Sequence, residues 1–448
     1  MHGETTAWVP QVLFGGDPFW VSLAIFAITY VAIITERLNR AIIALVGACL
    51  MIFGGVLNQQ AALRGVDFNT LGLLTGMMVI VAVARKCGVF QYVAIWSAKK
   101  VHARPWGILV MLSIMTAVFS ALLDNVTTVL LVAPVTLLIT EELNIKPYPF
   151  LFAEIFASNI GGTATLIGDP PNIMIGSATG LTFNQFLFNL APVTPLILVL
   201  TMGMIYLIWG RNMHAEPAAR ERVMRFDERE AITDVRLLKQ STFVMTLVIL
   251  GFVLAHPLHL EPATVAMGGA ALLLLLDNFP RHAEAQSEHV HKTFGEVEWV
   301  TIFFFLGLFI VVHGIETAGV LTWLANKVIA LTGGNLAVTA QAILWVSAVA
   351  SAIVDNIPFV ATMIPLIKSM APVFGGQEQL LPLWWALALG ACLGGNGSLI
   401  GASANLIVAG ISERAGHPIR FLAFTLLAFP LMLMSIGVSS VYICWRYL

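Results

Sequence analysis

Long apolar runs constrain the fold of this chain more than any other feature. Five of them are WVSLAIFAITYVAIIT, IIALVGACLMIFGGVL, TPLILVLTMGMIYLIWG, TFVMTLVILGFVLA and VAMGGAALLLLL. A helix needs roughly 20 apolar residues to cross a bilayer, and several runs approach or exceed that length. Charged residues make up only 11% of the chain, whereas soluble domains carry about 25%. The sequence therefore predicts an all-α polytopic membrane protein, expected in the cell inner (plasma) membrane.

The chain also contains an internal duplication. The segment VDFNTLGLLTGMMVIVAVARKCGV recurs in the second half as VEWVTIFFFLGLFIVVHGIETAGV. At nearly the same offset, ALLDNVT recurs as AIVDNIP, and NIGGTATLIGDPPN recurs as CLGGNGSLIGASAN. Three matches in the same order indicate a duplication. We expect two repeats, 18–210 and 240–448, joined by a charged cytoplasmic linker, 211–239.

Each repeat is expected to contain five spans, so that the second repeat is inverted relative to the first. The five predicted spans of the first repeat are 18–35, 40–57, 69–86, the broken 147–178 and 182–210. Residues 105–140 are predicted to form a re-entrant hairpin. With the N-terminus outside, only four of the 23 Lys and Arg residues fall outside the cytoplasm, as the positive-inside rule requires. These four are Arg64, Lys327, Lys368 and Arg446.

The stretch NIGGTATLIGDPPN, residues 159–172, breaks a hydrophobic segment with glycines and prolines. Irregular backbone at membrane depth is tolerated only inside protein or against a watery cavity. Matching interruptions in inverted repeats indicate the substrate site of a secondary transporter. The expected transport-domain elements are 105–178 and 336–411. The candidate substrate-binding residues are Asn125, Thr127, Asn159, Gly161, Gly162, Thr163, Thr165, Asn172, Asn356, Gly395, Asn396, Ser398 and Asn405.

Three aspartates at bilayer depth are the candidate ion-coupling residues: Asp124, Asp169 and Asp355. A buried carboxyl can carry a proton or meet a cation. Each aspartate could instead cap a helix through backbone N–H groups, which is a common role of aspartate. The sequence leaves open whether the coupling ion is a proton or sodium.

Other polar residues are weaker candidates, with a structural role as the alternative: Glu154, His282, His289, His291, His313, Glu316 and Cys392. No CxxC pair or zinc spacing occurs, so neither a metal site nor a cofactor is expected. No HExxH, Walker or GxGD motif occurs, so the chain is not expected to be an enzyme. The net charge of −2 says little about partners, and no nucleic-acid partner is expected.

The paired Asp-Asn motifs and AEIFASNIGGTATLIGDPPNIMI resemble the ion transporter superfamily. The branch that looks closest contains arsenite permeases, NhaD-type sodium/proton antiporters and the melanosomal P protein. The resemblance covers nearly the whole chain. It implies a scaffold of outer helices, a transport domain of two hairpins and two broken helices, and elevator-like alternating access. It also implies a possible homodimer. Since no nucleotide motif is present, active transport would be gradient-driven or would use a separate soluble ATPase subunit.

The hairpin tips differ from those of the related sodium-coupled dicarboxylate carriers, which have Ser-Asn-Thr at both tips. Here the tips read Asp-Asn-Val-Thr and Asp-Asn-Ile-Pro. An added carboxylate at each tip repels a dianion, and neither broken segment contains Lys or Arg. An acidic site without arginine suits a neutral solute or a cation. The resemblance therefore leads to arsenite or antimonite efflux coupled to protons. The alternatives are a sodium/proton antiporter and an organic or halide anion carrier.

Overall fold

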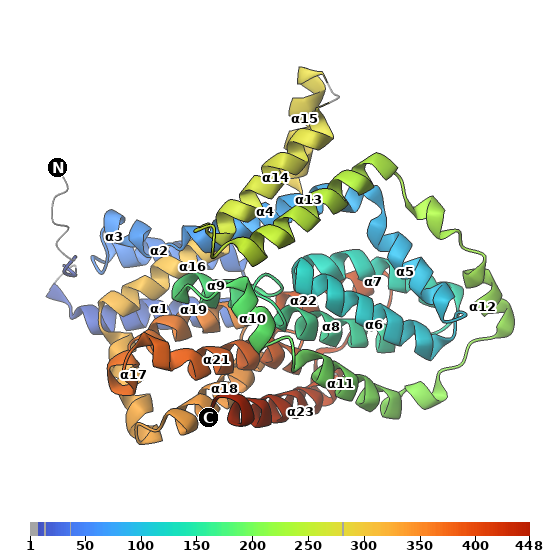
Figure 1. Cartoon of the computed structure of the whole chain (residues 1–448). Helices are drawn as coiled ribbons and strands as arrows, with labels where there is room; N and C mark the ends of the chain where they lie inside the picture. Colours follow the sequence, from blue (N-terminus) through green and yellow to red (C-terminus); the bar gives the residue numbers. More distant parts are fainter. Residues whose placement is uncertain (1–7, 13–14, 36, 280–281) are drawn as a thin grey trace.

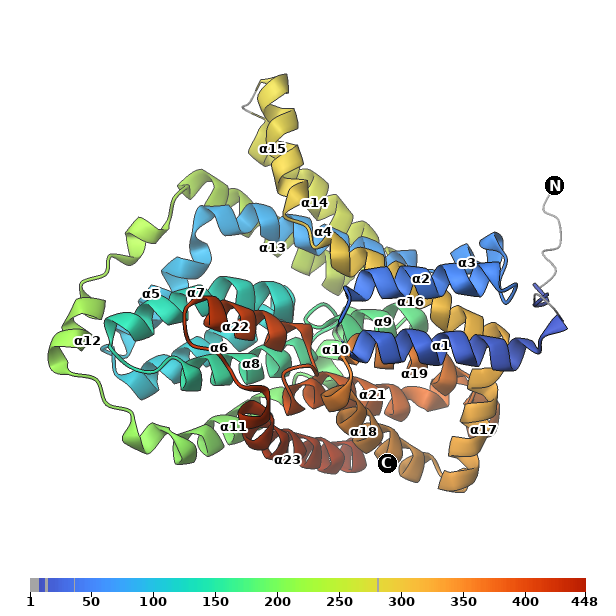
Figure 2. The same cartoon turned by 180° about the vertical axis from the view of Figure 1, so that it is seen from behind.

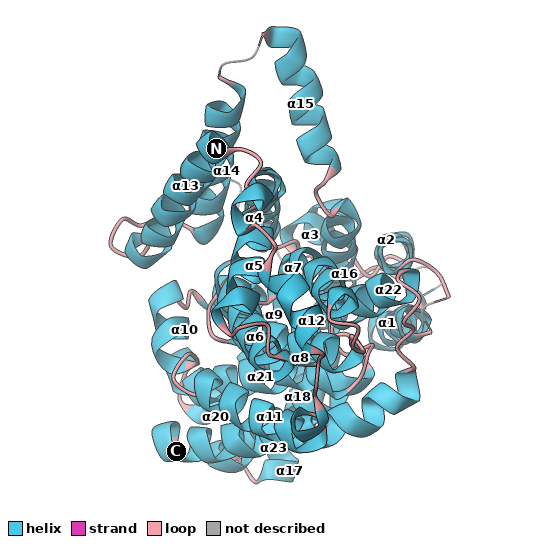
Figure 3. Ribbon diagram, turned by 90° about the vertical axis from the view of Figure 1, so that its right-hand side faces the viewer, coloured by secondary structure: helices cyan, strands magenta, loops and turns pink. Residues whose placement is uncertain are grey.

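The computed structural model describes residues 8–12, 15–35, 37–279 and 282–448, and in these ranges the regular structure is helical with no strand (Figure 3). The first half contains α1 (Pro18–Ile34), α2 (Arg40–Phe53), α3 (Gln59–Arg64), α4 (Phe68–Ala84), η2 (Arg85–Cys87), α5 (Val89–Lys100), α6 (Pro105–Leu122), α7 (Asn125–Glu142), α8 (Tyr148–Thr163), α9 (Pro170–Thr179), α10 (Phe183–Asn189) and α11 (Thr194–Ile208). Between the halves lie η3 (Gly210–Asn212), α12 (Pro217–Met224) and η4 (Glu228–Ala231).

The second half also combines long helices with short and interrupted ones. It contains α13 (Val235–Leu254), α14 (Pro262–Asn278), α15 (Ala283–Gly295), α16 (Trp299–Thr317), α17 (Val320–Thr332), α18 (Leu336–Ile353), α19 (Asn356–Lys368), α20 (Ala371–Phe374), η5 (Gln377–Leu380), α21 (Leu381–Gly394), η6 (Gly395–Gly397), α22 (Ser403–Arg414) and α23 (Phe421–Tyr447). Among the described helices, 8 are long and apolar enough to cross a membrane, or 9 if the bent pair α10–α11 forms one span.

The predicted interruptions are present in the backbone. The segment predicted as a hairpin, 105–140, forms α6 and α7, which pack on one another and meet at Leu123 and Asp124. The segment predicted as a broken span, 147–178, forms α8 and α9, separated by residues 164–169. Pro170 and Pro171 stand at the first positions of α9, where the missing N–H groups of proline cost nothing.

The two halves of the chain are intertwined. Helix α4 packs along α14 and α2 along α16, while α7 contacts α22, α8 contacts α21 and α9 contacts α19 (Figures 1 and 2). Within the span Gln377–Gly397, which includes α21, 94% of the apolar window is buried, against 28% for α13. We call α6–α9 with α18–α22 the central cluster, because these helices contact one another across the two halves, and we call α1, α2, α4, α13, α14 and α16 the flanking helices.

The linker between the halves is attached to the rest of the molecule. Lys99 at the end of α5 forms an ion pair with Glu228, and Arg222 of α12 pairs with Glu142 at the end of α7 (3.3 Å). The hydrogen bond from Lys99 lowers the pKa of Glu228, which lies outside the spans. Ion pairs that water reaches contribute little stability individually, but these two show that the linker contacts the ends of α5 and α7 (Figure 1).

Candidate functional site

The tip of the first hairpin is held by Asp124, which is the N-cap of α7. Its carboxylate accepts a hydrogen bond from the Thr127 backbone N–H (2.8 Å) and another from the Thr127 hydroxyl (2.5 Å). These bonds satisfy groups that the start of a helix leaves unpaired. The N–H of Asn125 donates to the carbonyl of Gly168 (3.1 Å), so the tip is tied to the first break.

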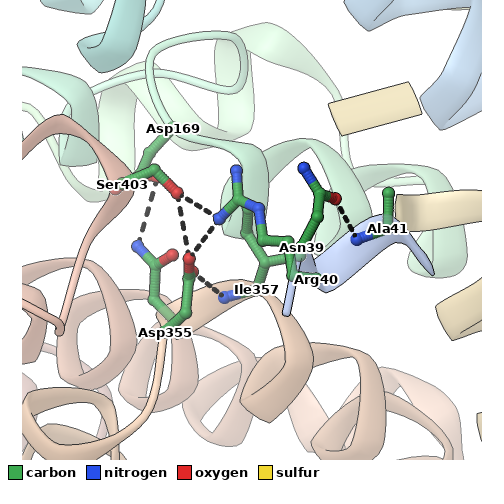
Figure 4. A network of polar contacts seen from close by, with 8 residues as sticks. Asn39, Arg40, Ala41, Asp169, Asp355, Ile357 and Ser403 are labelled. Atoms are coloured by element: carbon green, nitrogen blue, oxygen red, sulfur yellow. Dashed lines mark hydrogen bonds and ion pairs between the residues drawn. The ribbon is translucent and has the colours of Figure 1, made fainter. Parts of the chain in front are cut away.

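The tip of the second hairpin is held by Asp355, the N-cap of α19, which accepts a hydrogen bond from the Ile357 N–H (3.1 Å). It has two further partners (Figure 4). Arg40 Nη1 lies 2.7 Å from Asp355 Oδ2 and 2.6 Å from Ser403 Oγ, and the Ser403 hydroxyl donates to the same carboxylate oxygen (2.9 Å). The capping role considered for Asp124 and Asp355 is therefore present in both, and Asp355 also forms an ion pair.

The expectation of a site without arginine is wrong. Neither broken segment contains a basic residue, but Arg40 belongs to α2 and reaches the site from a flanking helix. Its side chain also lies over the ring of Phe304 of α16, 5.0 Å from the centroid, where a guanidinium is attracted to the ring face.

Glycines allow the backbone of each break to approach neighbouring backbone segments closely. A Cβ at Gly162 would lie 2.5 Å from the carbonyl oxygen of Gly168, and a Cβ at Gly395 would lie 2.9 Å from that of Gly401. A Cβ at Gly161 would lie only 2.1 Å from a backbone carbonyl oxygen of α6. Side chains at these positions would displace backbone atoms, so the glycines are required for the close approach of the segments.

Side-chain amides replace the helical hydrogen bonds that each break removes. Asn172 Nδ2 donates to the carbonyl of Thr165 (2.8 Å), and Asn405 Nδ2 donates to the carbonyls of Ser398 and Gly395 (both 2.8 Å). Because buried carbonyl groups need partners, these two asparagines hold the unwound backbone in equivalent ways in the two halves.

Asn159 connects the two breaks across the molecular centre. Its Nδ2 donates to Asn396 Oδ1 and Asn405 Oδ1 (both 3.0 Å), and its Oδ1 accepts from Asn125 Nδ2 (3.2 Å). All four side chains are buried. A fully buried amide network of this kind is costly to disturb, because each amide removed leaves its partners unsatisfied.

A cavity of about 70 Å³ lies where the hairpin tips and breaks meet the flanking helices. The starts of four helices, α7, α9, α19 and α22, line it. Each helix start carries partial positive charge. The lining residues are Arg40, Leu74, Met78, Asp124, Asn125, Val126, Thr127, Asp169, Pro170, Glu298, Thr301, Asn356, Ile357, Ser403 and Ile407.

Asp169 differs from the other two aspartates. It precedes α9, yet its carboxylate makes no capping hydrogen bond. Oδ1 accepts a long bond from Asn356 Nδ2 (3.4 Å), and the carboxylate also faces the buried thiol of Cys392. Among the described residues, Oδ2 makes no hydrogen bond of ordinary geometry although the side chain is fully buried. Buried carboxylate oxygens are normally satisfied. Asp169 is therefore the lining carboxylate best placed to take up a proton or cation.

Five of the predicted site residues line the cavity: Asp124, Asn125, Thr127, Asp169 and Asn356. Asp355 lies at the second hairpin tip and lines a neighbouring cavity instead. The other predicted residues do not line the central cavity and lie in the packed breaks and the amide network: Asn159, Gly161, Gly162, Thr163, Thr165, Asn172, Gly395, Asn396, Ser398 and Asn405. Three polar lining residues were not predicted, Arg40, Glu298 and Thr301, whereas Ser403 lines the cavity as one of the hydrogen-bonding groups that the sequence of the second break offers. Arg40 and Glu298 stand at the edges of apolar runs, a position that also suits a purely interfacial charge, so the sequence carried no specific signal for them.

The weaker candidates lie apart from this cavity or make ordinary contacts. His289 Nε2 is 2.6 Å from Asp277 Oδ2, and His313 Nδ1 is 3.1 Å from Glu316 Oε2. Within the described ranges, no group of three or more His, Cys, Asp or Glu residues is placed to hold a metal ion. Cys392 is fully buried, with its sulfur 3.5 Å from Asn172 Oδ1. Glu154 is buried in α8 and accepts a hydrogen bond from Thr136.

Paired helix breaks around a buried polar cavity, in an all-helical chain with membrane-length helices, define a membrane transporter. A family model described as "Citrate transporter" matches residues 30–390. The chain belongs to this citrate transporter (CitMHS) family, which is part of the ion transporter superfamily.

Several relatives are similar over nearly the whole chain. An uncharacterized transporter of Mycobacterium tuberculosis is 45% identical over 432 residues, covering 95% of this chain and 98% of the relative. The P protein of Mus musculus is 33% identical, covering 94% of this chain and 59% of its own length. The crystal structure of the Alcanivorax borkumensis YdaH transporter, described as having an unusual topology, matches with a TM-score of 0.58 at 14% identity, covering 96% of this chain and 98% of that one. That structural match concerns the fold alone.

Proposed function

We propose that this transporter exports arsenite or antimonite in exchange for protons. The observation that carries the proposal is Asp169, a buried carboxylate that faces the cavity with one oxygen unpartnered among the described residues. An ionisable group at bilayer depth costs about 3 kcal/mol and is functional by default. Asp169 takes up a proton on one side of the membrane and releases it on the other, and this exchange drives the solute.

The charges at the cavity favour a neutral solute together with a proton. Asp124, Asp169 and Glu298 line the cavity with three carboxylates, Arg40 supplies one guanidinium, and Asp355, the partner of Arg40, adds a fourth carboxylate beside the lining. Four helix starts add roughly half a positive charge each. The sum is an excess of about one negative charge, which one proton neutralises. Arsenous acid is neutral at physiological pH, and its hydroxyl groups can donate to the carboxylates and accept from the amides.

The size of the cavity points the same way. A cavity of about 70 Å³ is small but large enough for a compact solute, since a single water needs only about 10–15 Å³ of cavity volume. Three hydroxyl groups around one arsenic or antimony atom form a compact solute of this order. During transport the central cluster, α6–α9 with α18–α22, moves against the flanking helices and exposes the cavity to the opposite side. In the proposed orientation the N-terminus is outside and the linker is cytoplasmic, in the inner membrane.

Sodium/proton exchange is the second candidate. The unpartnered oxygens Asp169 Oδ2 and Asn125 Oδ1 belong to residues that line the same cavity, and carboxylate and amide oxygens suit hard cations. Citrate is the third candidate, favoured by the description of the family model and by Arg40. A multiply charged anion would meet an acidic cavity whose single arginine is already paired with Asp355.

The test uses everted membrane vesicles energised to be acidic inside, from cells with and without the protein. Radiolabelled arsenite should accumulate, and the accumulated label should be released when a protonophore is added. If arsenite does not accumulate but sodium dequenches a pH dye in a protein-dependent way, the second candidate replaces the first. If neither responds and citrate transport depends on the protein, the third does. Either of these last two outcomes overturns the arsenite proposal.

A further inference from the structure

Arg40 stands between two cavities. The first is the central cavity described above. The second, which we call the vestibule, measures about 350 Å³ and lies beside the connection between α1 and α2. Its lining includes Ile34, Leu38 and Asp355. Four residues line both cavities: Arg40, Glu298, Ser403 and Ile407. The ion pair therefore forms part of the wall that the two cavities share.

The contacts of Arg40 join a flanking helix to the central cluster. Arg40 starts α2, whereas Asp355 caps α19 and Ser403 starts α22. The guanidinium donates to Asp355 Oδ2 (2.7 Å) and to Ser403 Oγ (2.6 Å) (Figure 4). It also lies over the Phe304 ring of α16. The side chains of Arg40 and Asp355 are only 27% and 11% exposed. Charge-assisted bonds in such a setting are stronger than neutral ones.

The stability of α2 does not account for Arg40 at this position. Asn39 already caps the helix by accepting from the Ala41 N–H (2.9 Å). Arg40 is the first residue of the helix, where a positive charge is unfavourable because the helix start is itself positive. The arginine is therefore explained by the partners that it reaches across the molecule.

We propose that Arg40 is the gate residue of the central cavity. Paired with Asp355 and Ser403, it closes the passage to the vestibule, and when the pair breaks the passage opens. Any displacement of the central cluster relative to α2 must also break this pair, because its members lie on opposite sides of that boundary. The gate goes beyond the proposed transport reaction and does not depend on which solute is carried.

Cysteine accessibility tests the gate without transport. The exposed native thiols are first removed by Cys49→Ser and Cys444→Ser. One reporter, Thr301→Cys, lies in the central cavity alone, and a matched reporter, Ile34→Cys, lies in the vestibule alone. The purified protein in nanodiscs is treated with a small, charged methanethiosulfonate reagent, which reaches both membrane faces.

Arg40→Gln should raise the labelling rate at position 301 by about tenfold or more, because the substitution removes two hydrogen bonds made by a charged group. The rate at position 34 should stay the same. Equal labelling at 301 with and without Arg40→Gln would overturn the gate. This readout is independent of arsenite, sodium or citrate transport, so the gate and the proposed function can fail separately.

A second variant covers the case in which Arg40→Gln does not fold. Unfolding would expose the buried Cys87 and Cys392, and their labelling reports it. Asp355→Asn then replaces Arg40→Gln, since it removes the charge that pairs with the guanidinium and keeps a side-chain oxygen that can cap α19. A faster rate at position 301 with unchanged labelling at 34 supports the gate, and an unchanged rate at 301 refutes it.

Discussion

Asp169→Asn is the substitution that most directly tests the coupling mechanism. The new amide has the same shape and cannot exchange a proton. The native carboxylate makes one long hydrogen bond, 3.4 Å from Asn356, and no capping bond. Removing that hydrogen bond should therefore cost about 1 kcal/mol or less, while removing an ionisable group from bilayer depth relieves a cost of about 3 kcal/mol. The melting temperature in detergent should stay the same or rise.

Asp169→Asn should impair proton-coupled transport even though it does not destabilise the protein. In everted vesicles at equal protein levels, Asp169→Asn should abolish protonophore-sensitive accumulation of arsenite. Exchange of labelled for unlabelled arsenite, which needs no proton gradient, should remain. Asp227→Asn is the matched control, because the same change is made in the linker outside the spans, and it should leave both activities as in the unmodified protein.

Two results would refute this reasoning. Accumulation by Asp169→Asn that equals the unmodified protein and still collapses with a protonophore would show that another group carries the proton. A clear fall in the melting temperature would show instead that the Asp169 carboxylate has a stabilising partner, contrary to its surroundings in the structure.

Two further predictions concern packing and the linker. Gly168→Ala places a Cβ 2.5 Å from the Gly162 carbonyl oxygen, so it should cost about 1–3 kcal/mol or more and lower the melting temperature. Gly268→Ala in α14, where a Cβ meets nothing within 4 Å, should be neutral or slightly stabilising, and equal destabilisation by both would contradict the steric argument. Lys99→Gln breaks the half-buried pair with Glu228 and should shift the melting temperature by little, since ion pairs that water reaches contribute about 1 kcal/mol or less. A large destabilisation would mean that the linker holds the fold together.

The positions of the interruptions were predictable because local chemistry controls them. Glycines and prolines end helices whatever surrounds them, and the breaks at residues 164–169 and after Gly397 follow from that. Asp124 and Asp355 were identified for the same reason, since an aspartate before a helix is both a capping residue and a charge at membrane depth. The sequence could not distinguish these roles, because both use the same side chain at the same place.

The sequence could not predict which asparagines line the cavity and which hydrogen-bond to other groups in the packed interior. Asn159 and Asn396 are separated by 237 positions and meet in one amide network, Asn356 lines the cavity, and Asn125 does both. All four have the same hydrogen-bonding groups. Whether an amide faces a cavity or a neighbouring backbone depends on how the two halves intertwine, and that is a property of the packed structure.

By itself, the sequence determined the class of the protein: apolar runs require a membrane, and duplicated interruptions require a polar interior at membrane depth. Only the tertiary structure shows which charged residues meet at the site. Arg40 and Asp355 are separated by 315 positions, and nothing local to either residue indicates the other. They meet because α2 packs along α16, which in turn contacts α19, and long-range packing of this kind depends on the shape of the whole chain rather than on any segment of it.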